Sequence, residues 1–182
     1  MPLTEPAPRE KIHCRDIRIE GYRREDGLWD IEAHMTDTKT YGFGNAFRGH
    51  IAPGEPLHDM WLRLTLDEDL VVQGLEASTE AAPFQACPSI TPNYARMAGV
   101  KVGPGWNRAI KERLGGVEGC THLREVLGAM ATVAFQTLYP VLARKKPKDD
   151  QPRRPSLIDS CHAYRADGPI VKTNWPDFYE GQ

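Results

Sequence analysis

The sequence predicts an α+β fold, in which an antiparallel sheet of hairpins from the N-terminal half is packed by helices from the C-terminal half. Apolar and polar side chains alternate in several segments of the first half, which is typical of strands with one wet face. In the second half the apolar spacing changes to three and four residues, which is typical of helices. The length of 182 residues, with 40% hydrophobic and 26% charged residues, suits one globular domain.

The first two predicted strands form a hairpin. Ile17 and Ile19 alternate with charged neighbours, and Asp26-Gly27 supplies the positive φ angles that a tight turn needs. The clearest strand follows, and the side chains on its apolar face are Trp29, Ile31, Ala33 and Met35.

A second hairpin is predicted further along the first half. Residues 36–57 are rich in glycine and proline, so we expect a loop or an irregular edge strand there. Alternation returns over residues 60–66, acidic residues at 67–69 make a turn, and residues 70–77 form the next strand.

Helices are predicted from residue 92 onward. A short helix over 92–98 ends at Gly99, and a helix over 106–114 stops at Gly115-Gly116. Thr121 caps the next helix. Its predicted buried stripe is Leu123, Leu127, Met130, Ala134 and Leu138.

The chain is expected to divide into four parts. Residues 1–10 are a flexible lead, and residues 11–143 are a single α+β domain. Residues 144–155 are charged and proline-rich, so they are expected to be a solvated linker. Residues 156–182 regain apolar side chains and are expected to pack back on the domain.

Composition argues against several classes of function. The formal net charge of −2 and the lack of a basic stripe argue against nucleic-acid binding. We see no apolar run near the roughly 18 residues of a membrane span, and no signal peptide, so a cytoplasmic protein away from membranes is expected. No phosphate loop or dinucleotide fingerprint occurs, so no nucleotide cofactor is expected.

The first candidate for chemistry is Cys120, at the start of a predicted helix. The helix dipole and free N–H groups there favour the thiolate, which attacks substrates and binds metals. His122 lies in the first turn and can point the same way. The alternative is a buried core cysteine beside a surface histidine.

Other ligand-type side chains are more scattered. Cys87 lies where the sheet ends and the helices begin, a kind of junction that holds many sites. Cys161 and His162 are adjacent in the tail. For Cys87 alone a structural role is favoured, and for Cys161 the alternative is a buried thiol in a docked tail.

The strand entrance at His58-Asp59 supplies candidate proton carriers. Neighbours in a strand point to opposite faces, so a direct couple between these two is not expected, and His58 is the preferred candidate. Trp61 and Arg63 lie on the face opposite Met60 and are assigned to substrate binding.

A metal site is the second possibility for the same residues. Cys87, Cys120, His122, Cys161 and His162 provide the mixed sulfur and nitrogen ligands that zinc accepts, and iron is an alternative. The spacing matches no standard zinc finger, because no CxxC is present.

Several segments together resemble one bacterial family of domains of unknown function. They are GYRREDGLWDIEAHMTDTK, GEPLHDMWLRLTLDEDL, APFQACP, LGGVEGCTHLREVL and DSCHAYRADGP, and the resemblance covers roughly residues 10–175. This resemblance implies a family and no mechanism.

The order of hairpin strands, cysteine, helices and helix-starting cysteine is also similar to the U-type iron–sulfur cluster scaffold proteins. That resemblance implies a zinc or cluster site at Asp59, Cys87 and Cys120. The chain departs from that family because His58 stands where a first cysteine is expected and the Cys87–Cys120 spacing is shorter.

These observations lead to one preferred function and two alternatives. The preferred function is an enzyme of small-molecule metabolism, a lyase or hydrolase that acts on an apolar or aromatic substrate. Its chemistry works either with or without the help of a bound metal. His58, Asp59 and Cys120 are its expected catalytic residues. The alternatives are a non-enzymatic metal or iron–sulfur carrier, and a ligand- or protein-binding domain with structural cysteines. The sequence leaves the oligomeric state open.

Overall fold

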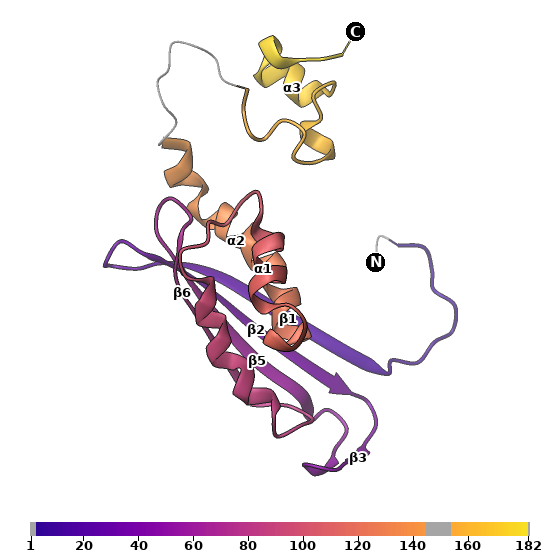
Figure 1. Ribbon diagram of the computed structural model, residues 1–182. Helices are drawn as coiled ribbons and strands as arrows, with labels where there is room; N and C mark the ends of the chain where they lie inside the picture. The colour runs from indigo at the N-terminus through magenta and orange to yellow at the C-terminus, as the bar shows by residue number, and fades with distance from the viewer. Residues whose placement is uncertain (1–2, 145–153, 182) are drawn as a thin grey trace. The chain divides into compact units, whose positions relative to one another are not determined.

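The computed structural model describes residues 3–144 and 154–181 (Figure 1). The chain divides into two compact units, residues 1–145 and 146–182, and each is described by itself. Residues 3–10 are exposed and form neither helix nor strand. Most of the predicted linker, residues 145–153, lies outside the described residues.

The first unit contains a four-stranded antiparallel sheet, which confirms the predicted fold class. Its strands are β1 (His13–Arg23), β2 (Trp29–Lys39), β5 (Pro56–Leu66) and β6 (Val72–Ala81), in the order β1-β2-β5-β6. Two three-residue strands, β3 (Phe43–Asn45) and β4 (Gly49–Ile51), form a separate hairpin between β2 and β5.

The alternating side chains produce one buried face and one open face. Every second residue of β2 from Trp29 to Asp37 is buried, and the same holds in β5 from His58 to Leu66. Ile31 lies opposite Leu64 in the register, and both are fully buried. Gly27 has a φ of 88°, so the predicted turn at Asp26-Gly27 is confirmed.

The segment 36–57 is more regular than predicted. β2 continues to Lys39 and β5 begins at Pro56, so only the middle of this segment is irregular. The polar run Thr36-Asp37-Thr38 concealed the end of β2, because a buried carboxylate occupies a position where an apolar side chain is expected.

The helices of the first unit all cover one face of its sheet (Figure 1). They are η1 (Cys87–Met97), α1 (Trp106–Leu114), η2 (Gly116–Glu118) and α2 (Thr121–Arg144). The predicted bounds of α1 are confirmed. The buried stripe of α2 is also confirmed, with Val126 in addition. The segment predicted as a helix over 92–98 belongs to a longer 3-10 helix that begins at Cys87.

Helix α2 corrects the expectation that no apolar run of the sequence approaches the length of a membrane span. Residues 126–143 carry no charged side chain, and the helix is long and apolar enough to cross a membrane by length and composition, with a mean hydropathy of 1.5. Its stripe from Leu123 to Leu138 packs into the core of the first unit, and helices of protein cores can have the same length and apolar composition.

The second unit has a small core of its own. It contains η3 (His162–Tyr164), α3 (Pro169–Asn174) and η4 (Pro176–Phe178). Ile158, Ala166 and Val171 are buried together, with Trp175 packed against them. That the tail packs on the domain stays a prediction.

Candidate functional site

The covered face of the sheet carries a buried carboxylate near the end of β2. Asp37 is 2% exposed. Arg15 of β1 reaches both carboxylate oxygens, from Nε to Oδ1 at 2.8 Å and from Nη2 to Oδ2 at 2.8 Å. Nε2 of His13 lies 3.0 Å from Oδ1, and Nδ1 of His58 lies 2.8 Å from Oδ2. The carboxylate is therefore surrounded by four hydrogen-bonding nitrogen atoms.

These contacts fix the charge state of Asp37 and His58. Burial by itself raises the pKa of Asp37, but the hydrogen bonds from Arg15 and His58 outweigh it and lower the pKa to about 2. Burial and the nearby His122 lower the pKa of His58, against the raising effect of Asp37. At neutral pH the pair is therefore an ionised carboxylate and a neutral imidazole. Because such a carboxylate only accepts, Nδ1 of His58 carries the proton.

Two residues at the start of α2 extend this group. The ring centroid of His122 lies 4.0 Å from that of His58, and Nε2 of His122 lies 4.0 Å from Oδ2 of Asp37. Sγ of Cys120 lies 3.7 Å from Nδ1 of His122. The thiol, two imidazoles and the carboxylate therefore form one continuous group, which we call the Asp37 cluster (Cys120, His122, His58 and Asp37).

The backbone of Cys120 is held in place by a buried tyrosine. The hydroxyl of Tyr94 accepts from the N–H of Cys120 at 3.1 Å and donates to its carbonyl at 3.2 Å. Burial raises the pKa of Tyr94 to about 12, so the hydroxyl keeps its proton. A Cβ at Gly119 would overlap with the carbonyl of Leu114, so glycine permits this tight entry into α2.

Comparison with known proteins identifies a family. The chain matches a family model described as protein of unknown function (DUF2889) over residues 13–136. The chain belongs to the DUF2889 family. The predicted family resemblance is thereby confirmed, and the DUF2889 match contains every residue of the Asp37 cluster. No curated protein matches, and no solved structure matches, so the similarity to U-type scaffold proteins has no support from those searches.

The DUF2889 region brings together three of the predicted site residues and separates three others. His58, Cys120 and His122 meet in the Asp37 cluster. The three that are separated from it are Asp59, Trp61 and Arg63, whose side chains lie on the open face of the sheet. Assigning these three to the same site is therefore wrong, because successive strand residues point to opposite faces.

Those three residues have partners of their own on the open face. Asp59 lies 2.8 Å from Nε2 of His34, and Trp61 stacks on the same imidazole with ring centroids 3.8 Å apart. Arg63 donates to Glu32 at 2.8 Å.

The predicted five-residue metal set is not assembled in the DUF2889 region. Cys87 begins η1 and is absent from the ligand cluster found among the described residues. Cys161 and His162 belong to the second unit. The ligand atoms that do gather are those of Asp37, His58 and His122, all within 4.8 Å of one another.

The sequence interpretation missed Asp37, Arg15 and His13. Asp37 could be recognised from the alternation in the strand. It follows Trp29, Ile31, Ala33 and Met35 at the same two-residue spacing and so occupies a core position. A charged side chain at such a position must have partners. Arg15 and His13 carried no such signal, since the predicted first strand began at Ile17 and did not include them.

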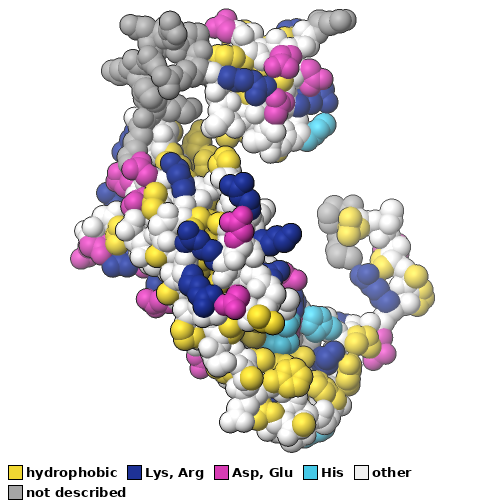
Figure 2. Space-filling model, viewed as in Figure 1, with side chains coloured by type: hydrophobic (Ala, Val, Ile, Leu, Met, Phe, Trp, Pro, Cys, Tyr) yellow, Lys and Arg dark blue, Asp and Glu magenta, His cyan; other side chains and the backbone are white. Residues whose placement is uncertain are grey.

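Aromatic side chains surround the end of the sheet that holds the Asp37 cluster. The exposed ones are Tyr41 and Phe47, in and beside the β3–β4 hairpin, and Phe84, which follows β6. The amide of Asn45 donates to the carbonyl of Pro83 at 3.1 Å and ties the hairpin to the segment that holds Phe84. Figure 2 shows histidine side chains at the surface beside a group of hydrophobic side chains.

Proposed function

We propose that this protein is a hydrolase or lyase of small-molecule metabolism in which His58 accepts the proton. The observation that carries the proposal is the buried hydrogen bond between His58 and Asp37, 2.8 Å long. Nδ1 of His58 donates its N–H to Asp37 as a hydrogen bond, which leaves the lone pair of Nε2 free to accept a proton from a substrate or water. The lowered pKa of His58 keeps this nitrogen unprotonated at neutral pH.

Cys120 is the nucleophile in the hydrolase version of this proposal. Its sulfur lies 3.7 Å from Nδ1 of His122, which takes the thiol proton as the sulfur attacks the ester carbonyl carbon. The carbon–oxygen bond to the alcohol then breaks, and His122 returns the proton to the departing alcohol. His58 accepts a proton from the water that cleaves the resulting thioester, which releases the acid and the free thiol. In the lyase version, His58 removes a proton from a substrate carbon, the electron pair forms a double bond to the adjacent carbon, and a leaving group departs from that carbon with its bonding electrons. Cys120 is then a contact residue.

The substrate class that fits this site is apolar or aromatic. Exposed clusters of aromatic side chains on a protein of this size commonly mark binding surfaces. Tyr41, Phe47 and Phe84 surround the sheet end at which β2 leaves Asp37 and β5 enters at His58. We therefore assign substrate contact to these three residues in place of Trp61 and Arg63.

A metal-assisted version is the second candidate, and the mutual distances of Asp37, His58 and His122 favour it. Two imidazoles and a carboxylate suit zinc or iron, which would polarise a substrate oxygen. However, a carboxylate has about four acceptor positions, and the four nitrogen contacts of Asp37 occupy them. A metal ligated by Asp37 has to replace one of these contacts, so the metal-free version is preferred.

The experiment compares two histidines that lie on opposite faces of the sheet. Full-length protein, purified without a metal-affinity tag, is assayed on p-nitrophenyl benzoate and p-nitrophenyl acetate. We expect His58→Gln to lower kcat by about 100-fold or more, as loss of a general base does. His34→Gln is the matched control, because His34 also bonds an aspartate but on the open face, and its kcat should stay within about twofold.

The same preparations discriminate between the alternatives. Turnover that His58→Gln and His34→Gln reduce equally, or no turnover of either ester, would refute the proposed hydrolase. Mass spectrometry of bound metals is run beside a His122→Ala variant. Near-stoichiometric zinc or iron that is lost in this variant, without turnover, supports the carrier. Absence of both metal and turnover supports a binding domain.

A further inference from the structure

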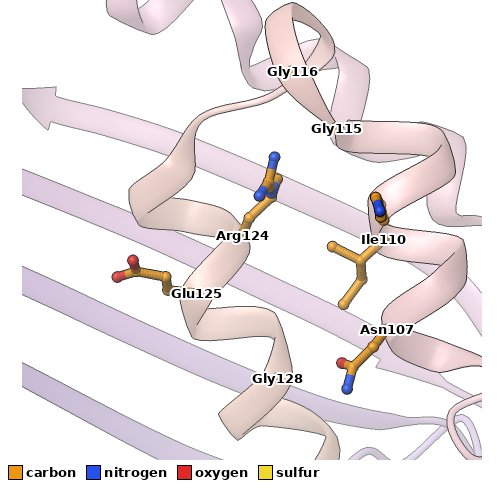
Figure 3. A pocket seen from close by; sticks show the side chains of 8 residues that line it. Asn107, Ile110, Gly115, Gly116, Arg124, Glu125 and Gly128 are labelled. Carbon is orange, nitrogen blue, oxygen red and sulfur yellow. The ribbon is translucent and has the colours of Figure 1, made fainter.

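A groove lies between α1 and the first half of α2, on the outer side of the helices (Figure 3). Its volume is about 450 Å³. Ile110 and Lys111 line it from α1, and Arg124 and Gly128 line it from α2. The loop Gly115-Gly116 closes one end, and the side chain of Arg124 points toward that loop.

The groove carries uncompensated positive charge. Neither Lys111 nor Arg124 makes an ion pair with a carboxylate in the part of the chain that the structure describes. Glu125 also borders the groove, but its carboxylate bonds to Arg15 at 2.8 Å and points away from α1. Two cations therefore face the groove without an acidic neighbour to neutralise them.

Glycines keep the walls of the groove bare. Gly128 lies inside α2, where glycine costs about 1 kcal/mol relative to alanine. A Cβ built on Gly128 meets no atom within 4 Å, so no packing contact requires glycine there. At Gly115 a Cβ would overlap with the carbonyl of Lys111, so glycine lets the loop approach α1 closely. A larger side chain at Gly128 would stand in the groove.

We propose that this groove binds a small organic oxyanion, a phosphorylated or carboxylated molecule that carries an apolar group. The guanidinium of Arg124 offers paired N–H donors that match a phosphate or carboxylate, and Lys111 adds a second charge. The apolar group lies against Ile110 and the bare helix surface at Gly128. This site is separate from the Asp37 cluster, and its binding does not depend on the proposed catalysis.

The test is a titration of the isotope-labelled full-length chain, followed by nuclear magnetic resonance. The probes are phenyl phosphate, benzoate and inorganic phosphate, and the signals are the amides of Gly115 and Gly116 and the side-chain Nε–H of Arg124. We expect saturable shifts with phenyl phosphate or benzoate, and weaker binding of inorganic phosphate because it lacks the apolar group. The probe that binds more tightly identifies the head group as phosphate or carboxylate.

Three variants make the test specific. Arg124→Gln should weaken binding about tenfold or more, which is the loss of one charge-assisted contact. Arg108→Gln is the matched control, because Arg108 is an arginine of the neighbouring helix α1 that is 80% exposed and pairs with Glu112. Its affinity should stay within about twofold of the wild type. Gly128→Leu should block the groove without removing a charge.

Three results would overturn the proposal. The first is an absence of saturable shifts with all probes. The second is equal weakening by Arg108→Gln and Arg124→Gln, which would mean general attraction to a basic surface. The third is unchanged binding in Gly128→Leu, which would place the anion outside the groove. Thermal unfolding of each variant checks that it is folded.

Discussion

Two aspartate–histidine pairs lie on the same two strands of this sheet, one on each face. Asp37–His58 and Asp59–His34 both connect β2 to β5, and both distances are 2.8 Å. The side chains of the first pair are 2% and 9% exposed, whereas those of the second are 26% and 31% exposed. The residue types and the distance are therefore equal, and the surroundings differ.

The difference shows how burial and additional partners change the surroundings of a common pair. Asp37 receives a bidentate Arg15 and has His122 nearby, and burial strengthens every one of these electrostatic contacts. The pair on the open face shares its histidine with Trp61 and remains in contact with water. The four predictions that follow test this contrast, from the largest expected effect to the smallest.

Removal of the buried charge should have the largest effect on stability. Asp37→Asn leaves Arg15 and His58 facing a neutral group inside the protein, and we expect a loss of about 3 kcal/mol or more in the free energy of unfolding. Asp59→Asn should cost less than about 1 kcal/mol, because its pair is partly solvated. Urea unfolding measures both. Equal losses would mean that burial does not distinguish the pairs.

Lowering the pH should reveal the same contrast between the buried pair and the open-face pair without a large change in packing. The pKa of Asp37 is lowered from 3.8 to about 2, so its stabilising effect is present above pH 4 and is lost as the pH falls through 2. This amounts to about 2 kcal/mol. Since the pKa of His58 is also lowered, the unfolded state takes up protons first, and a further loss begins as the pH falls through 6.5.

Unfolding by urea at a series of pH values measures these losses. In Asp37→Asn the step below pH 4 should shrink, whereas Asp59→Asn should keep it. His58→Gln should remove the step near pH 6.5, and His34→Gln serves as its control. A profile for Asp37→Asn that is parallel to the wild type down to pH 2 would contradict the assigned pKa of Asp37.

Two glycines test how closely the helices cover the sheet. Gly21 of β1 lies on the covered face, and a Cβ there would overlap with Thr137 of α2. Gly21→Ala should therefore cost about 1.5 kcal/mol. Gly74 of β6 lies opposite Thr65 on the open face, and a Cβ there meets nothing within 4 Å. Gly74→Ala should change stability by less than about 0.5 kcal/mol. Thermal unfolding of the two variants is the measurement.

The smallest effect is expected from the tryptophan of the open face. Trp61 is 42% exposed and makes a stacking contact with His34, so Trp61→Phe should cost less than about 0.5 kcal/mol. Trp106 is buried and its indole N–H donates to the carbonyl of Leu127 at 3.0 Å. Trp106→Phe should therefore cost about 1 to 3 kcal/mol, because that carbonyl loses its buried partner. A larger loss for Trp61→Phe would indicate that the open face is covered in the native protein.

Much of this fold follows from local patterns in the sequence. The alternation in β2 and β5 predicted which side chains are buried, and the stripe from Leu123 to Leu138 predicted the covered face of α2. These predictions succeed because the period of a strand or helix is a local property. The β3–β4 hairpin was missed, since its three-residue strands are too short to show a period.

The site was predicted only in part, for a reason that differs from element to element. Cys120 and His122 were found because they are neighbours in sequence at a helix start. Asp37 and Arg15 are 22 residues apart, and their meeting depends on the pairing of β1 with β2 in one particular register. Asp59 was kept as a second candidate because alternation along a strand does not tell which of the two faces carries a site, and the structure places it with His34 on the open face.

The contacts of Arg15 have a consequence for the order in which the protein is completed. This one side chain reaches Asp37 in the neighbouring strand and Glu125, 110 residues further along the chain. During synthesis the sheet segments leave the ribosome well before α2, and contacts this distant in sequence form slowly. Until α2 docks, the face of the sheet that carries Asp37 is not covered by this helix, and Cys120 and His122 have not reached Asp37. The complete Asp37 cluster therefore comes together only when α2 docks, so chains that lack α2 can pair Asp37 with His58 in the sheet but hold neither Cys120 nor His122 beside them.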